Sequence, residues 1–290
     1  MFVRWRCHQS RGLQIIILLA LCCAVAACGS LTATTPSAGS SVGTPATGVQ
    51  PNAPGTTGTP SPTLPGWTLL WHDEFDGKAI DPGRWTVASS QPGGYVGCCL
   101  AYGDAAWAPD NVSVSQGQLH IRSVDEPSAG KPYSSGAITT GQTFSFTYGR
   151  VDIRARLPRT DGLWPAFWLL PVQGDSPGYA PYEIDMMEAW GANPHQVFAY
   201  FHWHNTQVEC TLAGPDFSAD FHVYTLIWTP DTLQWAVDGV TQCVSSEHVP
   251  QEAMYLNVSV AVGGKAQSTD SLTRLPQTTD VTYVRIWKPA

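Results

Sequence analysis

The sequence predicts an all-β fold, an antiparallel β-sandwich, for residues 67–290. Short runs of apolar, β-branched and aromatic residues recur there between Gly, Pro, Asp and Asn, which is typical of strands joined by turns. This part shows no long helical period, and 43% hydrophobic content in 290 residues is enough to bury a sizeable core. The predicted strands are 67–71, 112–114, 119–124, 149–157, 164–170, 196–203, 222–228, 233–237, 254–260 and 282–288.

Residues 1–28 have the pattern of an export signal. Three arginines precede an apolar run at residues 13–27, which is too short for an ordinary membrane span. The run ends in Ala27-Cys28-Gly29-Ser30 and resembles a bacterial lipobox, which implies cleavage before Cys28 and attachment of a lipid to its sulfur. The alternative is ordinary secretion after another peptidase removes the leader.

Residues 29–66 are almost entirely Gly, Ser, Thr, Pro and Ala, without charge. Such a segment cannot form a core, so we expect a disordered linker. With a lipid on Cys28, the linker would hold the domain 67–290 at the extracellular face of a membrane.

The net charge and the aromatic content of the domain indicate which kinds of molecule it could bind. When Arg4, Arg6 and Arg11 of the leader are left out of the 15 basic residues, 12 remain against 23 acidic ones, a net charge near −11. This argues against nucleic acid as a partner. The 12 Trp, 10 Tyr and 9 Phe suit a cleft that binds the apolar faces of sugar rings, although we expect about half of the tryptophans to pack in the core.

One otherwise apolar stretch holds three carboxylates, Glu183, Asp185 and Glu188. Carboxylates are costly to bury, so we expect them to line a wet cleft; the alternative is a solvated strand face. In a regular strand Glu188 would point away from the other two. One extra residue, a β-bulge within Met186-Met187, brings it to their side. If both glutamates lean inward, their carboxyl groups come about 5 Å apart, which suits retaining glycoside hydrolysis.

The stretch resembles the bulged E-x-D-x-x-E signature of glycoside hydrolase family 16, in its laminarinase-like form. Other segments resemble the family in the same order, namely 71–77, 111–119, 148–156, 221–228, 237–239 and 283–287. The resemblance implies a concanavalin-like jelly roll with a concave glycan-binding groove. It also implies double displacement, with Glu183 as nucleophile, Glu188 as general acid and then base, and Asp185 between them. Spacing alone does not decide which glutamate has which role.

Aromatic and histidine residues near the carboxylates add to the predicted site. Trp164 and Trp168 share a strand face by alternation, and we expect both indoles to bind sugar rings; the alternative is that both belong to the core. In the family a histidine on the strand that follows the carboxylates assists catalysis, and His202 matches it best. Such a histidine can hydrogen-bond a carboxyl group and tune its pKa. The alternatives are a purely structural His202, or His204 in its place.

Four cysteines follow the leader and allow three disulfide pairings. We expect Cys210 to pair with Cys243, because both are predicted in loops that flank the strands 222–228 and 233–237. The adjacent Cys98 and Cys99 are left open, with a vicinal bridge as one alternative.

We expect no cofactor. Many family members bind a structural calcium ion with an Asp just before the final strand, but the matching residue here is Thr282 and the nearest carboxylate is Asp280, so calcium is unsupported.

The sequence therefore predicts a retaining, endo-acting glycoside hydrolase of β-1,3- or mixed-linkage β-1,3/1,4-glucan. We expect a monomer that acts on a polysaccharide and contacts the membrane only through its lipid anchor. Laminarinase-like members often have an arginine where Gly136-Ala137 stand here, which leaves the exact substrate open. The alternatives are a β-galactan hydrolase, a β-glucan transglycosylase, or a non-catalytic surface glucan-binding protein. The last is disfavoured because all three carboxylates are present.

Overall fold

The computed structural model describes residues 62–95, 103–172, 182–190, 193–204, 206–264, 269 and 273–290. Over these ranges the protein consists of β-strands and connecting segments, with one short 3₁₀ helix, η1, at Pro109–Asn111. No helix within them is both long and apolar enough to cross a membrane.

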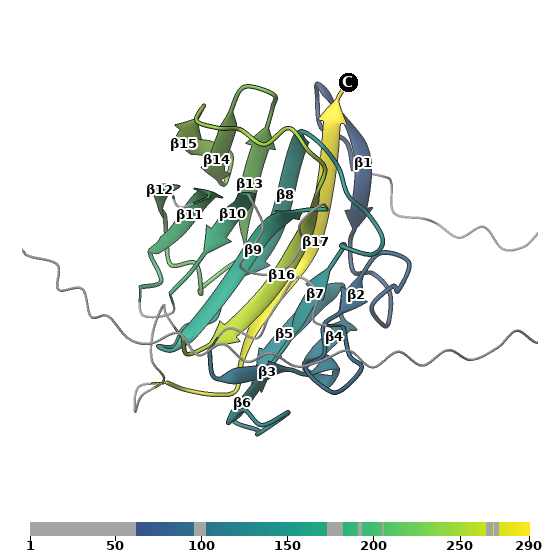
Figure 1. Ribbon diagram of the computed structural model, residues 1–290, viewed down its shortest axis with the longest axis vertical. Coiled ribbons are helices and arrows are strands. Elements are labelled where there is room, and N and C mark those ends of the chain that lie inside the picture. The colour runs from purple at the N-terminus through teal and green to yellow at the C-terminus, as the bar shows by residue number, and fades with distance from the viewer. Residues whose placement is uncertain are drawn as a thin grey trace, which may run out of the picture. The chain divides into compact units, whose positions relative to one another are not determined.

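A seven-stranded antiparallel sheet carries the predicted site (Figure 1). Its strand order is β12-β11-β10-β9-β16-β7-β2, so β10, which holds the three carboxylates, lies between β9 and β11. The strands are β12 Thr206–Ala213, β11 Gln196–Trp203, β10 Tyr182–Glu188, β9 Leu163–Pro171, β16 Met254–Val262, β7 Ala137–Thr139 and β2 Thr86–Val87.

An eight-stranded sheet forms the second layer, with the order β15-β14-β13-β8-β17-β5-β4. The eighth strand of this sheet, β1, lies outside that order and pairs with the C-terminal end of β17, where Figure 1 shows the C-terminus. The strands are β15 Val240–Ser245, β14 Leu233–Val237, β13 His222–Trp228, β8 Gly149–Arg156, β17 Gln277–Pro289, β5 Gln118–Ser123, β4 Val112–Ser115 and β1 Trp67–Asp73. A small parallel pair, β3 Ala105–Trp107 and β6 Tyr133–Ser135, completes the set.

The core lies between the two sheets. Alternate residues of the central strands point into it, such as Phe167 and Ile184 from one sheet and Ile153 and Ile286 from the other, and all four are fully buried. Alternation with one face buried is what two stacked antiparallel sheets require. The predicted all-β sandwich is therefore confirmed. Among the described residues six tryptophans are buried, which equals the expected half of the twelve in the chain: Trp85, Trp107, Trp168, Trp228, Trp235 and Trp287.

Several strands were not predicted. β12 and β15 are edge strands with many exposed residues, so they lack the apolar runs that mark the central strands. β2, β3, β6 and β7 are two or three residues long, too short to show a period. The last strand begins at Gln277, earlier than predicted, because its first residues are polar yet still pair with β5.

Candidate active site

A β-bulge in β10 brings the three carboxylates to one face of the seven-stranded sheet. Between Asp185 and Glu188 the strand advances three residues while its partner β11 advances only two, from Tyr200 to Phe198. The register with β9 shifts at the same place. Glu183 and Asp185 face His202 and Tyr200, and the extra residue places Glu188 opposite Phe198 on the same side. The bulge predicted within Met186-Met187 is confirmed.

A tryptophan from the other sheet holds the bulge from behind. Trp235 of β14 is fully buried, and its indole N–H donates a hydrogen bond of 3.0 Å to the backbone carbonyl of Asp185. A bulge interrupts the regular ladder, and a buried carbonyl needs a donor. Sequence reasoning missed this residue because Trp235 is one of several strand tryptophans, and no local pattern connects it with a residue 50 positions away.

Burial raises the pKa of all three carboxyl groups. The pKa of Glu183 rises to about 8, mainly through burial and secondly through the charge of Asp185. Burial raises the pKa of Asp185 to about 7, although its hydrogen bond with Glu183 acts in the opposite direction. The pKa of Glu188 rises well above its ordinary value through burial and the charges of the other two. The cluster therefore retains protons near neutral pH, as proton-transfer chemistry requires.

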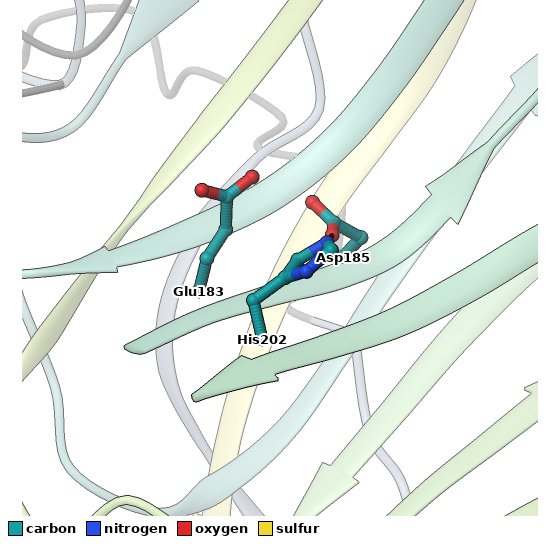
Figure 2. Close-up of side chains that lie close together, drawn as sticks. All are labelled: Glu183, Asp185 and His202. Atoms are coloured by element: carbon teal, nitrogen blue, oxygen red, sulfur yellow. Dashed lines mark ion pairs between the residues drawn. The ribbon is translucent and has the colours of Figure 1, made fainter. Parts of the chain in front are cut away.

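His202 contacts this cluster directly. Its Nε2 lies 3.1 Å from Oδ2 of Asp185, and Figure 2 shows the imidazole against the Asp185 carboxyl with Glu183 beside them. The ring stacks on Tyr200, with 5.5 Å between ring centroids. A charge on His202 lowers the pKa of both Glu183 and Glu188. His204 follows the end of β11 in a turn, so His202 is the histidine that the structure brings to the carboxylates.

The two predicted tryptophans lie on the same face as the carboxylates. Trp164 is partly exposed, and its indole N–H donates a hydrogen bond to Glu188, which lowers the pKa of that carboxyl. Trp168 pairs with Asp185 across the strands and is only 8% exposed, and its N–H donates to the hydroxyl of Ser259 at 3.1 Å. Trp164 is thus the more accessible indole, and sugar stacking by either one stays a prediction.

Within the described residues, neither the carboxylate cluster nor the position expected for calcium fits a metal ion well. Glu183, Asp185 and His202 offer ligand atoms within 4.8 Å of one another, but the imidazole already pairs with Asp185. At the position expected for calcium, Arg154 donates to the Thr282 hydroxyl at 3.3 Å. A guanidinium repels a cation, so these residues do not fit a calcium ion.

The nearby Asp280 is no better suited to calcium. Its oxygens contact His120 at 2.7 Å and Arg156 at 2.6 Å, so both are already engaged by nitrogen donors.

The structure contains the expected disulfide between Cys210 and Cys243. Both residues lie in strands, β12 and β15, rather than in the loops that the sequence suggested. These are edge strands of different sheets, so the disulfide joins the two layers. Cys28, Cys98 and Cys99 lie outside the described residues.

The chain is similar to known carbohydrate-active proteins. The profile described as "Glycosyl hydrolases family 16" matches residues 101–283. The β-glucanase of Rhodothermus marinus is 35% identical, over 79% of this chain and 87% of its own length. Glucan endo-1,3-β-glucosidase A1 of Niallia circulans is 32% identical over 80% of this chain, but the chain spans only 39% of that relative.

Solved structures agree in fold. The catalytic domain of an endo-1,3-β-glucanase (laminarinase) from Thermotoga petrophila has a TM-score of 0.70 and 30% identity, and the match covers 77% of this chain and 98% of that one. The laminarinase from Rhodothermus marinus has a TM-score of 0.69 and 31% identity, covering 79% and 100%. The matched segments include every strand around the carboxylates, and the chain therefore belongs to glycosyl hydrolases family 16.

Proposed function

We propose that the protein is a retaining, endo-acting glycoside hydrolase that cleaves β-1,3- or mixed-linkage β-1,3/1,4-glucan. The observation that carries this proposal is the bulge that brings Glu183, Asp185 and Glu188 to one strand face. The names of the relatives support the substrate class, because they include glucan endo-1,3-β-glucosidases, β-glucanases and endo-1,3-1,4-β-glycanases.

In the proposed mechanism Glu183 attacks the anomeric carbon and forms a covalent glycosyl-enzyme. Glu188 donates its proton to the glycosidic oxygen as that bond breaks, and the aglycone part of the polymer leaves. Glu188, now ionised, then takes a proton from water, whose oxygen attacks the anomeric carbon and releases Glu183. The strongly raised pKa of Glu188 suits the acid role, because it favours the protonated form of the group.

Asp185 can accept the proton that Glu183 must lose before it acts as the nucleophile. A nucleophile must be ionised, whereas burial favours the neutral form of Glu183. The hydrogen bond between the two groups raises the pKa of Glu183 and lowers that of Asp185, so their shared proton rests on Glu183 and must move to Asp185 before Glu183 attacks. His202, in contact with Asp185, orients that carboxyl group.

Azide rescue tests the two glutamate roles separately. Glu183→Ala should lose hydrolysis of an activated aryl β-glucoside, and added azide should restore cleavage with an α-glycosyl azide as product, because azide replaces the missing nucleophile. Glu188→Ala should instead give a β-glycosyl azide, because azide attacks the covalent intermediate. The control is Glu126→Gln, an exposed glutamate in the segment that follows β5, which should keep parental activity. The opposite pair of azide products would reverse the two roles.

A panel of polymers tests the substrate. The domain should release internal fragments from laminarin or from mixed-linkage glucan, and size analysis of the products should show early shortening of long chains. Cleavage of β-galactan alone would refute the glucan assignment. Products longer than the supplied chains would indicate transglycosylation instead of hydrolysis.

We also propose that the protein is a lipoprotein held at the extracellular face of a membrane through Cys28. The apolar run before Cys28 and the uncharged linker after it support this. Labelled palmitate should be incorporated into the parent chain but not into Cys28→Ala. Equal labelling of both chains, or labelling of neither, would refute the anchor.

A further inference from the structure

A polar hollow lies on the outer face of the eight-stranded sheet, on the layer opposite to the carboxylates. Its volume is about 590 Å³. Its wall includes His120 of β5, Asp280 of β17 and Arg156 of β8, which are paired across neighbouring strands. The residues next to them in sequence, such as Leu119 and Val281, are fully buried in the core. The alternation therefore directs the wall residues outward.

Three arginines line this hollow, Arg122, Arg156 and Arg159, although the domain as a whole is acidic. Arg156 is held in place by Asp280, whose Oδ2 accepts its hydrogen bond at 2.6 Å. The other oxygen of Asp280 contacts His120 at 2.7 Å. Asp280 is only 6% exposed, so one buried carboxylate fixes both basic side chains.

The other two arginines have donors to spare. Arg122 is exposed and forms no ion pair with any residue that the structure describes. Arg159 pairs with Asp216 at 3.1 Å, yet 65% of its side chain is exposed. A guanidinium has five N–H donors, and each of these contacts uses few of them. Three guanidinium groups thus face two carboxylates that are already hydrogen-bonded, which leaves the hollow positive.

We propose that this hollow binds a saccharide unit that carries a phosphate or sulfate ester. Arginine pairs with such oxyanions through two parallel hydrogen bonds, which is why it is common in sites for these groups. The hollow is far larger than a bare oxyanion and lies in the range of small-molecule sites. Ser113, Ser218, Gln277 and Thr278 supply hydroxyl and amide groups along the rest of the wall, which suits sugar hydroxyls.

Binding of small probes tests the proposal. Isothermal titration calorimetry should show binding of glucose 6-phosphate or glucose 6-sulfate, whichever ester the site prefers, and no binding of glucose. Arg122→Gln combined with Arg159→Gln should weaken that binding about tenfold or more, because two charge-assisted contacts are lost. Arg156 is left unchanged so that its ion pair with Asp280 is the same in the parent and in the double variant.

The matched control is Arg84→Gln, which removes an arginine from a surface ion pair with Asp81 outside the hollow. It should bind the ester as the parent does. Both variants should hydrolyse neutral glucan at the parental rate, so a failure here is separate from a failure of the proposed activity. The proposal is overturned if neither ester binds, if inorganic phosphate or glucose binds as tightly as the ester, or if the double variant binds like the parent.

Discussion

Replacing Glu183 with glutamine should make the domain more stable while it abolishes hydrolysis. The pKa of Glu183 rises from 4.5 to about 8, chiefly because the carboxyl group is buried. The folded protein therefore binds this proton more tightly than the unfolded chain does. The resulting loss of stability is absent below pH 4.5, grows as the pH rises from 4.5 to 8, and is constant above that. Glutamine is neutral at every pH, so the Glu183→Gln variant does not lose this stability as the pH rises.

The size of the effect follows from the shift. One pKa unit corresponds to roughly 1.4 kcal/mol, so the ceiling is about 5 kcal/mol above pH 8 and about 3 kcal/mol at pH 7. The gain should be smaller, about 2 kcal/mol at pH 7, because Asp185 shares the proton and the buried amide must also be satisfied. For a domain of this size that is roughly 4–8 °C in Tm.

Calorimetric melting of parent and Glu183→Gln between pH 4 and pH 9 measures this. The two melting temperatures should coincide near pH 4 and diverge as the pH rises, with the variant higher. Glu126→Gln, which changes an exposed glutamate, should follow the parent at every pH. A difference that does not depend on pH, or a variant that melts below the parent at pH 7, would refute the reasoning.

Three further predictions concern the bulge, the histidine and the disulfide. Deleting Met187 should remove the bulge and leave Glu183, Asp185 and Glu188 at alternate positions on one face of a regular strand, so a folded deletion variant, checked by circular dichroism, should still cleave laminarin; a folded variant without activity would contradict this. His202→Ala should move the pH–activity profile to higher pH, because the charge of His202 lowers the pKa of Glu183 and Glu188; an unchanged profile would disprove the electrostatic role. Replacing Cys210 and Cys243 with serine opens a link between residues 33 apart and should cost about 3 to 4 kcal/mol in the free energy of unfolding, measured by urea titration, whereas equal midpoints would contradict it.

The sequence predicted the central strands and the bulge because both rest on local patterns. Alternation marks a strand with one buried face, and the five-residue offset from Glu183 to Glu188 is compatible with a shared face only if one residue is extra. His202 was within reach of the same reasoning, since its strand must pair with the carboxylate strand. Edge strands such as β12 and β15 were missed because most of their residues are exposed; in β12 only Cys210 and Leu212 are buried, too few to mark a strand.

Contacts between residues far apart in the sequence could not be predicted, for a different reason. The hydrogen bond from Trp235 to Asp185 crosses from one sheet to the other, and the pairing of Asp280 with Arg156 and His120 depends on strand order. Neither follows from residue spacing. The extent to which Trp168 is covered also depends on neighbours from several strands, which is why its burial was not foreseen.

The Trp235 indole holds the irregular step of β10 from the interior, through the backbone and not through a side chain on the face that carries the carboxylates. A substitution on that face therefore leaves this backbone contact intact, whereas a substitution of Trp235 removes it. The position of the carboxylates thus depends on a residue of the opposite layer that no substrate can touch.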